Sequence, residues 1–334
     1  MSNPIHRRSF FQSMRVMAAG AIGAPLALAS QTSAQPTGSP PAAGESLVKT
    51  SAGYVHPNRV LLWENTRREI RELLHANQLK AAILPTGSVE QHNEHMAMAS
   101  DVAIATLICQ SAALELYPQV IVAPPSPCGY APYHMARKGS MTLRRETFEA
   151  YVLDVMSSLK AHGIRTILVM NGHGGNVLPL REALPAWREQ LGINIDADSY
   201  ASGTPREVIH KFTRSKELTS HAGEFETSIY MAAFPERLRS ISMEDYDHAH
   251  LDYETGFSPE VEEFLRRDPR TFKNGKIDCT GYNAADRRRQ EEALLSRVET
   301  GEKLLSMAIE FVADRLRQMI AATESGKSWP VDSS

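Results

Sequence analysis

The sequence predicts an α/β fold with three layers, in which helices cover both faces of a mainly parallel central sheet. Short uninterrupted apolar runs, typical of buried strands, alternate along the chain with longer segments of helical periodicity. Such alternation requires crossover connections, which produce a parallel sheet covered on both faces. The two most polar short segments, 85–95 and 171–176, each directly follow an apolar run. They therefore lie where open α/β sheets bind their ligands.

The composition is that of an ordinary globular enzyme. Of the 334 residues, 42% are hydrophobic and 22% are charged, and the chain is long enough to bury a sizeable core. A formal net charge of −3 argues against a nucleic-acid binder, which needs a basic surface. Cys109, Cys128 and Cys279 form no C-x-x-C pair. We therefore expect buried free thiols rather than a zinc knuckle or a disulfide framework.

The first 34 residues have the pattern of an export signal. Arg7 and Arg8 precede a Ser-Phe-Phe sequence, and an Ala-rich apolar run extends from Val16 to Ala29. Small residues then lead to a cleavage site expected near Ala34. The Arg-Arg-x-Phe-Phe order resembles the twin-arginine signal. The apolar run is too short to span a membrane.

We therefore expect export to the periplasm by the twin-arginine machinery, with no stable membrane anchor. The alternative is a basic tail in which the arginine pair occurs by chance. Residues 35–50 are rich in Pro, Gly, Ala and Ser, and this composition predicts a disordered linker. Residues 51–325 are expected to form a single α/β domain.

The sequence of the first half of this domain predicts a helix, a strand, a second helix and a second strand, in that order. Residues 64–79 combine an apolar stripe with a charged opposite face, which is typical of a helix. Ala81–Leu84 predicts a buried strand that the following proline and glycine should end. A second helix should begin near Asp101, and Val120–Ala123 predicts a second strand ended by a Pro-Pro pair.

The second half continues the alternation. Apolar residues every three or four positions predict a helix over 146–161, with a glycine following it in the usual C′ position. Thr166–Met170 predicts a strand that leads into a polar turn and another helix, and Ile193–Ala197 predicts the fourth strand. The charged run Asp286–Glu292 should open a long C-terminal helix and form a solvated face.

The segment after the first strand carries Glu90 and His92, and Asp101 follows at the start of the next helix. Residues two apart in an extended loop project to the same side. Carboxylate and imidazole together suit zinc, manganese or iron rather than calcium. An aspartate between such ligands can bridge two ions about 3.5–4 Å apart. Each residue alone could be an ordinary loop residue, but their combination at a strand end indicates a metal site.

The turn 171–176 holds His173 between glycines directly after the third strand. Its glycines, at positions 172, 174 and 175, do not match the Gly-x-Gly-x-x-Gly spacing, and no Gly-Lys-Ser/Thr sequence is present. The sequence therefore excludes the usual dinucleotide and phosphate-binding loops. A histidine on a tight turn, where the backbone comes close to a ligand, suits a metal site.

The third polar segment, 221–227, begins an apolar helix that ends at Pro235. Glu224 and Glu226 cannot share one face of a regular helix, so at most one is expected to bind a metal. His221 lies five residues before Glu226, close enough for acid–base chemistry beside a metal. The alternative is a helix N-terminus with favourably placed acids.

Taken together, these segments resemble the creatininase family over about residues 58–240. The resemblance lies in these motifs: Gly87-Ser88-x-Glu90-Gln91-His92 with His95 and Asp101, Asn171-Gly172-His173-Gly174-Gly175-Asn176, and His221-Ala222-Gly223-Glu224-x-Glu226-Thr227-Ser228. His134 and the Gly139-Ser140-Met141-Thr142-Leu143 stretch also resemble the family's substrate-side loop.

The resemblance implies a three-layer α/β/α fold, two divalent metal ions and a symmetric homo-oligomer, often a hexamer. It implies these ligands: Glu90 and His173 for one ion, His92 and Glu226 for the other, and Asp101 bridging both. It implies that His221 transfers protons. The residues expected on the substrate side are His134, Ser140, Gly175 and Glu224.

Two departures from the family pattern bear on the substrate. The creatinine-hydrolysing members carry a glutamate two residues after the histidine of the Asn-Gly-His turn, where this sequence has Gly175. They also carry tryptophans at places that correspond to Ala201 and Glu217. We therefore expect a substrate other than creatinine. The chain is more similar to the broader amide-hydrolysing branch, which includes a formamide deformylase and a peptide-processing protease.

The expected activity is metal-dependent hydrolysis of a C–N bond in a small-molecule amide, cyclic amide or formamide. Zinc, manganese or iron ions would share the attacking hydroxide. One alternative is a lactone or ester hydrolase, because ester cleavage needs the same hydroxide and the same oxyanion stabilisation. The other is a non-catalytic periplasmic protein that binds metals or ligands, against which the presence of His221 argues.

Overall fold

The computed structural model describes residues 47–215, 221–244 and 256–330 of the chain. The predicted export signal, residues 35–46 of the predicted linker, and Glu217 lie outside the described residues. The last residues of the predicted linker, Val48–Thr50, form the strand β1. Among the residues described, no helix is both long and apolar enough to cross a membrane.

Four parallel strands form the central sheet, in the order β4-β3-β5-β6. They are β3 (Ala81–Thr86), β4 (Val120–Val122), β5 (Thr166–Asn171) and β6 (Asn194–Ser199). All residues of β3 and β5 are buried, as the apolar runs predict. β3 extends two residues beyond its predicted end, because Pro85 and Thr86 still pair with β5. The predicted parallel sheet is confirmed.

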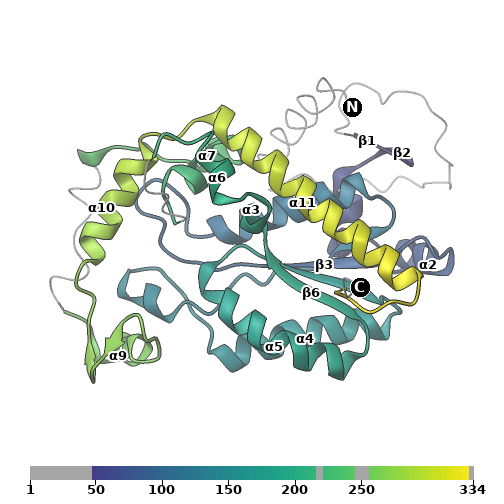
Figure 1. The fold of residues 1–334 in the computed structure, drawn as a ribbon, viewed down its shortest axis with the longest axis horizontal. Helices are drawn as coiled ribbons and strands as arrows, with labels where there is room; N and C mark the ends of the chain where they lie inside the picture. Colours follow the sequence, from purple (N-terminus) through teal and green to yellow (C-terminus); the bar gives the residue numbers. More distant parts are fainter. Residues whose placement is uncertain (1–46, 216–220, 245–255, 331–334) are drawn as a thin grey trace, which may run out of the picture.

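Helices cover both faces of this sheet (Figure 1). One face is covered by α4 (Arg145–Ala161) and α5 (Val177–Leu191). The other is covered by α3 (Ser100–Glu115), α7 (Glu224–Ala233) and α11 (Val298–Glu324). Neighbouring strand residues enter different cores: Ile83 packs with α3 and α11, and Leu84 packs with α4. This alternation follows from the pleat of a strand, and it confirms the three-layer architecture.

Shorter elements connect and surround these layers. They are β1 (Val48–Thr50), β2 (Gly53–Val55), η1 (Pro57–Val60), η2 (Leu62–Glu64), α2 (Arg67–His75), η3 (Pro132–Ala136), η4 (Gly174–Asn176), η5 (Tyr200–Gly203), α6 (Arg206–Ile209), η6 (Pro235–Arg237), α9 (Pro259–Leu265), β7 (Phe272–Lys273), β8 (Lys276–Ile277) and α10 (Tyr282–Ala293). The helix predicted over 64–79 is shorter because Thr66 and Glu69 form a capping box that begins it at Arg67.

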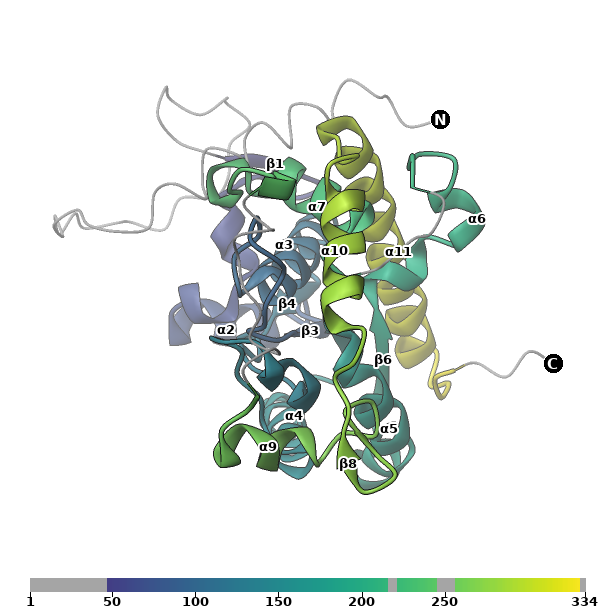
Figure 2. The same cartoon turned by 90° about the vertical axis from the view of Figure 1, so that its left-hand side faces the viewer.

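The charged run near the C-terminus lies in α10, a helix separate from α11. The prediction of a solvated face is wrong for Asp286 and Gln290, which are both buried. Asp286 forms an ion pair with Arg137, and Gln290 contacts His95. Figures 1 and 2 show α10 at one end of the molecule, beside α7.

The helices α7 and α11 approach each other closely at Gly301. A Cβ at this position would lie 1.8 Å from the carbonyl oxygen of Ser228. We expect Gly301→Ala to lower the free energy of unfolding by about 1–3 kcal/mol, because the helices must move apart. This loss should outweigh the better helix propensity of alanine.

Urea-induced unfolding would measure the change. Gln318→Ala, on the exposed side of α11, is the matched control and should stay within about 0.5 kcal/mol of the parent. Equal stability of Gly301→Ala and the parent chain would contradict the close packing.

Candidate metal centre

The carboxyl ends of β3 and β5 hold the first two polar segments side by side. Thr86 and Asn171 are opposite each other at the last pair of the register. Thr86 Oγ1 donates to Asn171 Oδ1 at 3.1 Å, and the N–H of Gly172 donates to the carbonyl of Thr86 at 2.8 Å. Asn176 Nδ2 also donates to the carbonyl of Gly87. The two loops are therefore joined directly where the strands end.

Glycines at these strand ends let α3 approach closely. A Cβ on Gly172 would lie 2.5 Å from the carbonyl oxygen of Asp101, and one on Gly87 would lie 2.7 Å from the backbone nitrogen of Val102. Any other residue would push the start of α3 away. The two glycines therefore bring Asp101 to the loops that carry Glu90 and His173.

The five residues predicted as metal ligands lie together in two groups. Glu90, Asp101 and His173 form one group, and His92, Asp101 and Glu226 form the other. Within each group the candidate ligand atoms lie within 4.8 Å of one another. Asp101 belongs to both groups: its Oδ1 is 3.1 Å from His92 Nε2, and its Oδ2 is 3.1 Å from His173 Nδ1.

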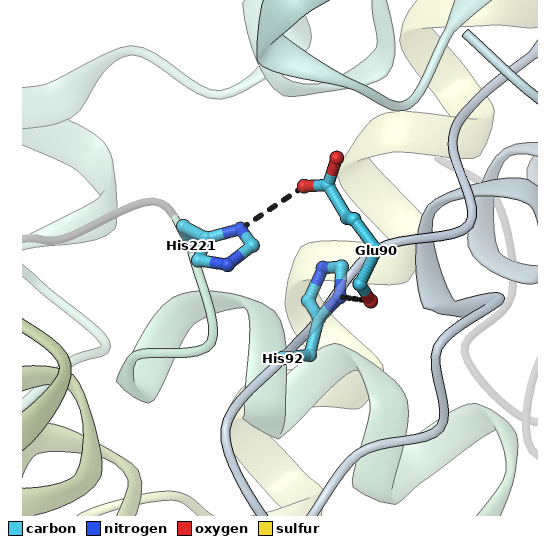
Figure 3. A group of neighbouring side chains, drawn as sticks. All are labelled: Glu90, His92 and His221. Carbon is cyan, nitrogen blue, oxygen red and sulfur yellow. Dashed lines mark hydrogen bonds and ion pairs between the residues drawn. The ribbon is translucent and has the colours of Figure 1, made fainter. Parts of the chain in front are cut away.

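Glu90 also lies beside two histidines that are not in these two groups. Its Oε1 is 3.0 Å from His134 Nε2 and 3.4 Å from His221 Nδ1. Figure 3 shows the His221 ring turned toward the Glu90 carboxylate, with His92 on the same loop as Glu90. The other carboxylate oxygen of Glu90, Oε2, lies 2.9 Å from His173 Nδ1.

Backbone contacts orient the two candidate imidazole ligands. His92 Nδ1 lies 3.0 Å from the carbonyl of Glu90, and His173 Nε2 lies 3.2 Å from the carbonyl of Tyr130. A carbonyl only accepts, so each of these nitrogens carries the proton. The opposite nitrogen of each ring therefore faces Asp101, as expected for a histidine that binds a metal.

Glu226 is positioned by the strained segment before α7. The backbone at Ala222 has a φ of 52°, which is unfavourable for alanine. Its N–H donates to Glu226 Oε2 at 2.7 Å. This contact holds the carboxylate 3.5 Å from His92 Nε2.

The residues present fit two divalent ions. Glu90, Asp101 and Glu226 are 1%, 2% and 4% exposed, so three carboxylates are withdrawn from water together. Glu90 Oε2 and Asp101 Oδ2 both face the one nitrogen Nδ1 of His173, and neither oxygen accepts a hydrogen bond of good geometry from the described residues. Buried negative charge of this kind needs compensation by cations. Three carboxylates and two imidazoles are the donor set of two-metal hydrolases that use zinc or manganese.

The electrostatics of the cluster also favour cations. Burial opposes protonation of His92 and His173, but neighbouring carboxylates raise the pKa of each to about 10. Burial raises the pKa of Glu226 to about 7, and the charge of Asp101 adds to this. For Glu90, burial raises the pKa, but His134 and His173 together hold it well below its ordinary value. The carboxylates thus hold positive charge at the centre.

Two other histidines at the centre are held neutral. Burial lowers the pKa of His134 to about 4. Burial, with the charges of His92 and His134, holds the pKa of His221 well below its ordinary value. Gln91 Nε2 lies 2.9 Å from His221 Nε2 and orients the ring. His221 is therefore an uncharged imidazole beside Glu90, in the place that the predicted proton transfer requires.

His95 connects the metal loop to two helices. Its Nε2 lies 2.8 Å from Thr227 Oγ1 of α7, and its Nδ1 lies 3.1 Å from Gln290 Oε1 of α10. Burial lowers its pKa to about 4, so the ring is neutral. His95 is thus a support of the loop that carries Glu90.

A cavity of about 480 Å³ opens onto this centre. His134 lines it, as predicted for a substrate-side residue, and Ala201 lies in its wall. Sequence reasoning missed these other wall residues: Tyr133, Arg137, Tyr200, Phe225, Arg270 and Arg289. Tyr133 could have been found as the neighbour of His134. Arg289 lies in the charged run that predicted a solvated face.

Three of the residues predicted to contact the substrate, Ser140, Gly175 and Glu224, are not among those that line the cavity. Ser140 Oγ accepts from the N–H of Gln91 at 3.1 Å and so supports the metal loop. Glu224 accepts from the N–H of Arg214 at 2.8 Å and from that of Ser215 at 2.5 Å. Since Glu226 is the glutamate beside His92, the structure favours Glu226 over Glu224 at the metal centre.

Gly175 packs behind His173 rather than lining the cavity. A Cβ there would lie 2.3 Å from His173 Nε2 and 2.2 Å from the carbonyl oxygen of Tyr130. A side chain would therefore disturb the contact that orients His173. A glutamate at this place would therefore require His173 and the backbone at Tyr130 to shift.

Known proteins are similar to this chain over most of its length. The creatininase family model, described as creatinine amidohydrolase, matches residues 63–316. The creatinine amidohydrolase of Pseudomonas putida is 25% identical over 256 residues, which are 72% of this chain and 90% of that protein.

Two further relatives are 30% identical over shorter stretches. They are the mycofactocin precursor peptide peptidase of Mycobacterium ulcerans and the 3-dehydro-scyllo-inosose hydrolase of Thermotoga maritima. Their matches cover 46% and 54% of this chain, and 58% of the length of each relative.

Solved structures share the fold. A crystal structure of creatinine amidohydrolase superposes with a TM-score of 0.59 at 23% identity, covering 78% of this chain and 98% of that one. A mutant creatininase complexed with creatine gives a TM-score of 0.59 at 23% identity, covering 77% of this chain and 97% of that one. These likenesses confirm the three-layer α/β architecture.

Because Asp101 belongs to both groups, its loss should affect both metal positions. We expect the purified parent chain to retain about two ions per chain after dialysis. Asp101→Ala should lose most of both, whereas Glu226→Gln should lose mainly one. Elemental analysis by plasma mass spectrometry measures the content, with Asp154→Asn on the exposed side of α4 as the control. Full metal content in Asp101→Ala would contradict a shared ligand.

Gly175→Ala should lower metal content and the thermal midpoint, because the added Cβ displaces His173. The neighbouring Gly174 is the matched control, since a Cβ there meets no atom within 4 Å. Gly174→Ala should therefore keep the metal content and thermal midpoint of the parent. Equal loss in both variants would show that the crowding at Gly175 is not the cause.

Proposed function

This chain belongs to the creatininase family, and on that basis we infer that it is a metal-dependent amidohydrolase that acts on C–N bonds. The observation that carries this inference is Asp101, which lies between two ligand groups at the floor of a cavity. A single shared carboxylate between two such groups is the arrangement of two-metal hydrolases.

The metal positions follow from the two groups. Glu90 and His173 would hold one ion, His92 and Glu226 the other, and Asp101 both. When bound, the ions supply Lewis-acid activation of water and of the amide carbonyl. Similar solved structures include a mutant creatininase of Zn-Zn type and a creatininase with Mn, and we propose zinc, manganese or iron here.

His221 is the proton-transfer residue in this proposal. Its Nδ1 faces the metal centre beside Glu90. The proton that the attacking water releases would reach the leaving nitrogen by way of this residue. Gln91 keeps the ring in this orientation.

We propose a substrate other than creatinine. The family's glutamate after the Asn-Gly-His turn would require His173 to shift if it stood at Gly175, since a Cβ there already contacts the His173 ring. Ala201 also lines the cavity where the creatinine-hydrolysing members carry a tryptophan. Both differences change the space that a substrate would occupy.

A panel of creatinine, cyclic amides, lactams and formamides, each with a matched lactone or ester, tests the function. We expect the metal-loaded enzyme to hydrolyse a member other than creatinine, with amides preferred to the matched esters. A preference for lactones would favour the ester-hydrolase alternative, and metal binding without turnover would favour a binding protein.

His221→Gln should lower kcat by about 10²–10⁴-fold while metal content is unchanged, because proton transfer is lost. His173→Ala should lower both activity and metal content. Near-normal kcat in His221→Gln would remove His221 from the mechanism. Lys160→Gln, on a helix remote from the cavity, serves as the control for the effect of substitution itself.

We also propose that the protein is exported to the periplasm by the twin-arginine route, which carries folded proteins. The Arg7-Arg8-Ser-Phe-Phe order and the apolar run after it support this. Replacing Arg7 and Arg8 with lysine should shift the protein to the cytoplasmic fraction. Lysine replacement of Arg67 and Arg68 in α2 is the control and should leave the fractionation unchanged.

A homo-oligomer, expected to be a hexamer, is part of the same proposal. Its support is the family relationship and several large apolar side chains at the surface, among them Trp63, Val177 and Leu178. Light scattering of the purified protein reports the oligomeric state directly.

A further inference from the structure

Three arginines line the cavity beside the metal centre: Arg137, Arg270 and Arg289. We call this set the arginine wall. Its members come from three separate segments, after η3, before β7 and within α10. Figures 1 and 2 show α10 at the end of the molecule, beside α7. The fold alone brings these arginines together.

Two buried aspartates fix the arginine wall. Arg137 donates from Nε and Nη2 to the Asp286 carboxylate at 2.7–2.9 Å, and Arg289 donates to it from Nη1. Arg270 donates from Nε and Nη2 to the carboxylate of Asp268. Neither aspartate is among the described residues that line the cavity. The carboxylates therefore hold the guanidinium groups from the side away from it.

The arginine wall has a donor to spare. Arg289 shares the Asp286 carboxylate with Arg137 and donates to that carboxylate from Nη1. Arg289 Nε is buried and has no hydrogen-bond partner among the described residues. A buried donor without a partner is unfavourable unless a ligand supplies the acceptor.

Aromatic rings hold two of these guanidinium planes. The Arg137 guanidinium lies 4.5 Å from the centre of the Tyr282 ring, and that of Arg270 lies 3.4 Å from the centre of the Tyr133 ring. Such stacking fixes the plane of the guanidinium group and excludes water beside it. An anion at this wall would therefore meet donors that are already oriented.

The arginine wall and the metal centre line the same cavity. Arg137, Arg270 and Arg289 lie in its wall together with Glu90, Asp101 and Glu226 of the metal centre. One small molecule can therefore contact both the metal centre and the arginine wall within a cavity of about 480 Å³.

We propose that the arginine wall binds a carboxylate group of the substrate, and that the natural substrate is a small or cyclic amide bearing one such anionic group. This proposal rests on the amidohydrolase function proposed above. A carboxylate can accept from the buried Nε of Arg289, a residue that lines the cavity beside the metal centre. Arg289 is the specificity-determining residue.

Matched pairs of cyclic amides that differ only by a carboxylate test this proposal: dihydroorotate with dihydrouracil, and pyroglutamate with pyrrolidinone. Their affinity for the metal-loaded enzyme is measured by calorimetry, and KM and kcat are measured where hydrolysis occurs. We expect the charged member of a pair to bind at least about tenfold more tightly. Equal affinity within both pairs would overturn the proposal.

Arg289→Gln separates the arginine wall from the metal ions, which can also attract a carboxylate. We expect this variant to reduce the charged-to-neutral preference about tenfold, chiefly through the affinity of the charged member. Arg289→Lys keeps the positive charge but loses the planar guanidinium group with its several fixed N–H donors. This variant should keep part of the charged-to-neutral preference. Arg287→Gln, an exposed arginine of the same helix paired with Glu291, is the control and should keep all of it.

An undiminished preference in Arg289→Gln would overturn the assignment of the anion to the arginine wall. Inorganic phosphate serves as a third probe. Phosphate that binds more tightly than the charged amides, and loses this affinity in Arg289→Gln, would overturn the carboxylate assignment. If no pair is hydrolysed, the amidohydrolase function fails for these amides, while the binding preference still decides the role of the arginine wall.

Discussion

Three carboxylates buried within reach of one another are the constraint on which the rest of this structure depends. Glu90, Asp101 and Glu226 come from a loop, a helix start and a second helix, and water reaches none of them appreciably. Their negative charge is tolerable only where cations are held close by. The raised pKa values of His92 and His173 show the same demand for positive charge. Two divalent metal ions bound at this site would supply the positive charge that the carboxylates need.

The parallel sheet makes this concentration of charge possible. The ends of β3 and β5 place two loops at one edge, and glycines there allow α3 to bring Asp101 against them. On the same face of the sheet as α3, α7 brings Glu226, and its close packing on α11 fixes where that helix lies. The layers of the fold thus serve to hold polar groups that would repel one another in a looser structure.

The C-terminal part of the chain completes the site with contacts of a different kind. Through Gln290 and His95, α10 supports the metal loop, and through Asp286 it fixes Arg137 and Arg289 at the cavity. One helix therefore serves both the metal centre and the arginine wall. The cavity has a negative floor that suits metal ions and a positive side that suits an anion. Such opposite charges a short distance apart select for a substrate with matching polarity.

The sequence by itself determined the order of strands and helices along the chain, and the parallel sheet, because these follow from local periodicity. It also determined that Glu90, His92 and His173 follow strand ends and that Asp101 begins a helix, because these positions follow from spacing. Tertiary structure decided what depends on distant partners. The choice between Glu226 and Glu224 required knowing which face of α7 meets the centre. The charged run in α10 predicted a solvated face, but Asp286 pairs with Arg137 at a separation of 149 residues. No pattern within a helix records a partner so far away, so only the folded chain could show that this arginine wall lines the cavity.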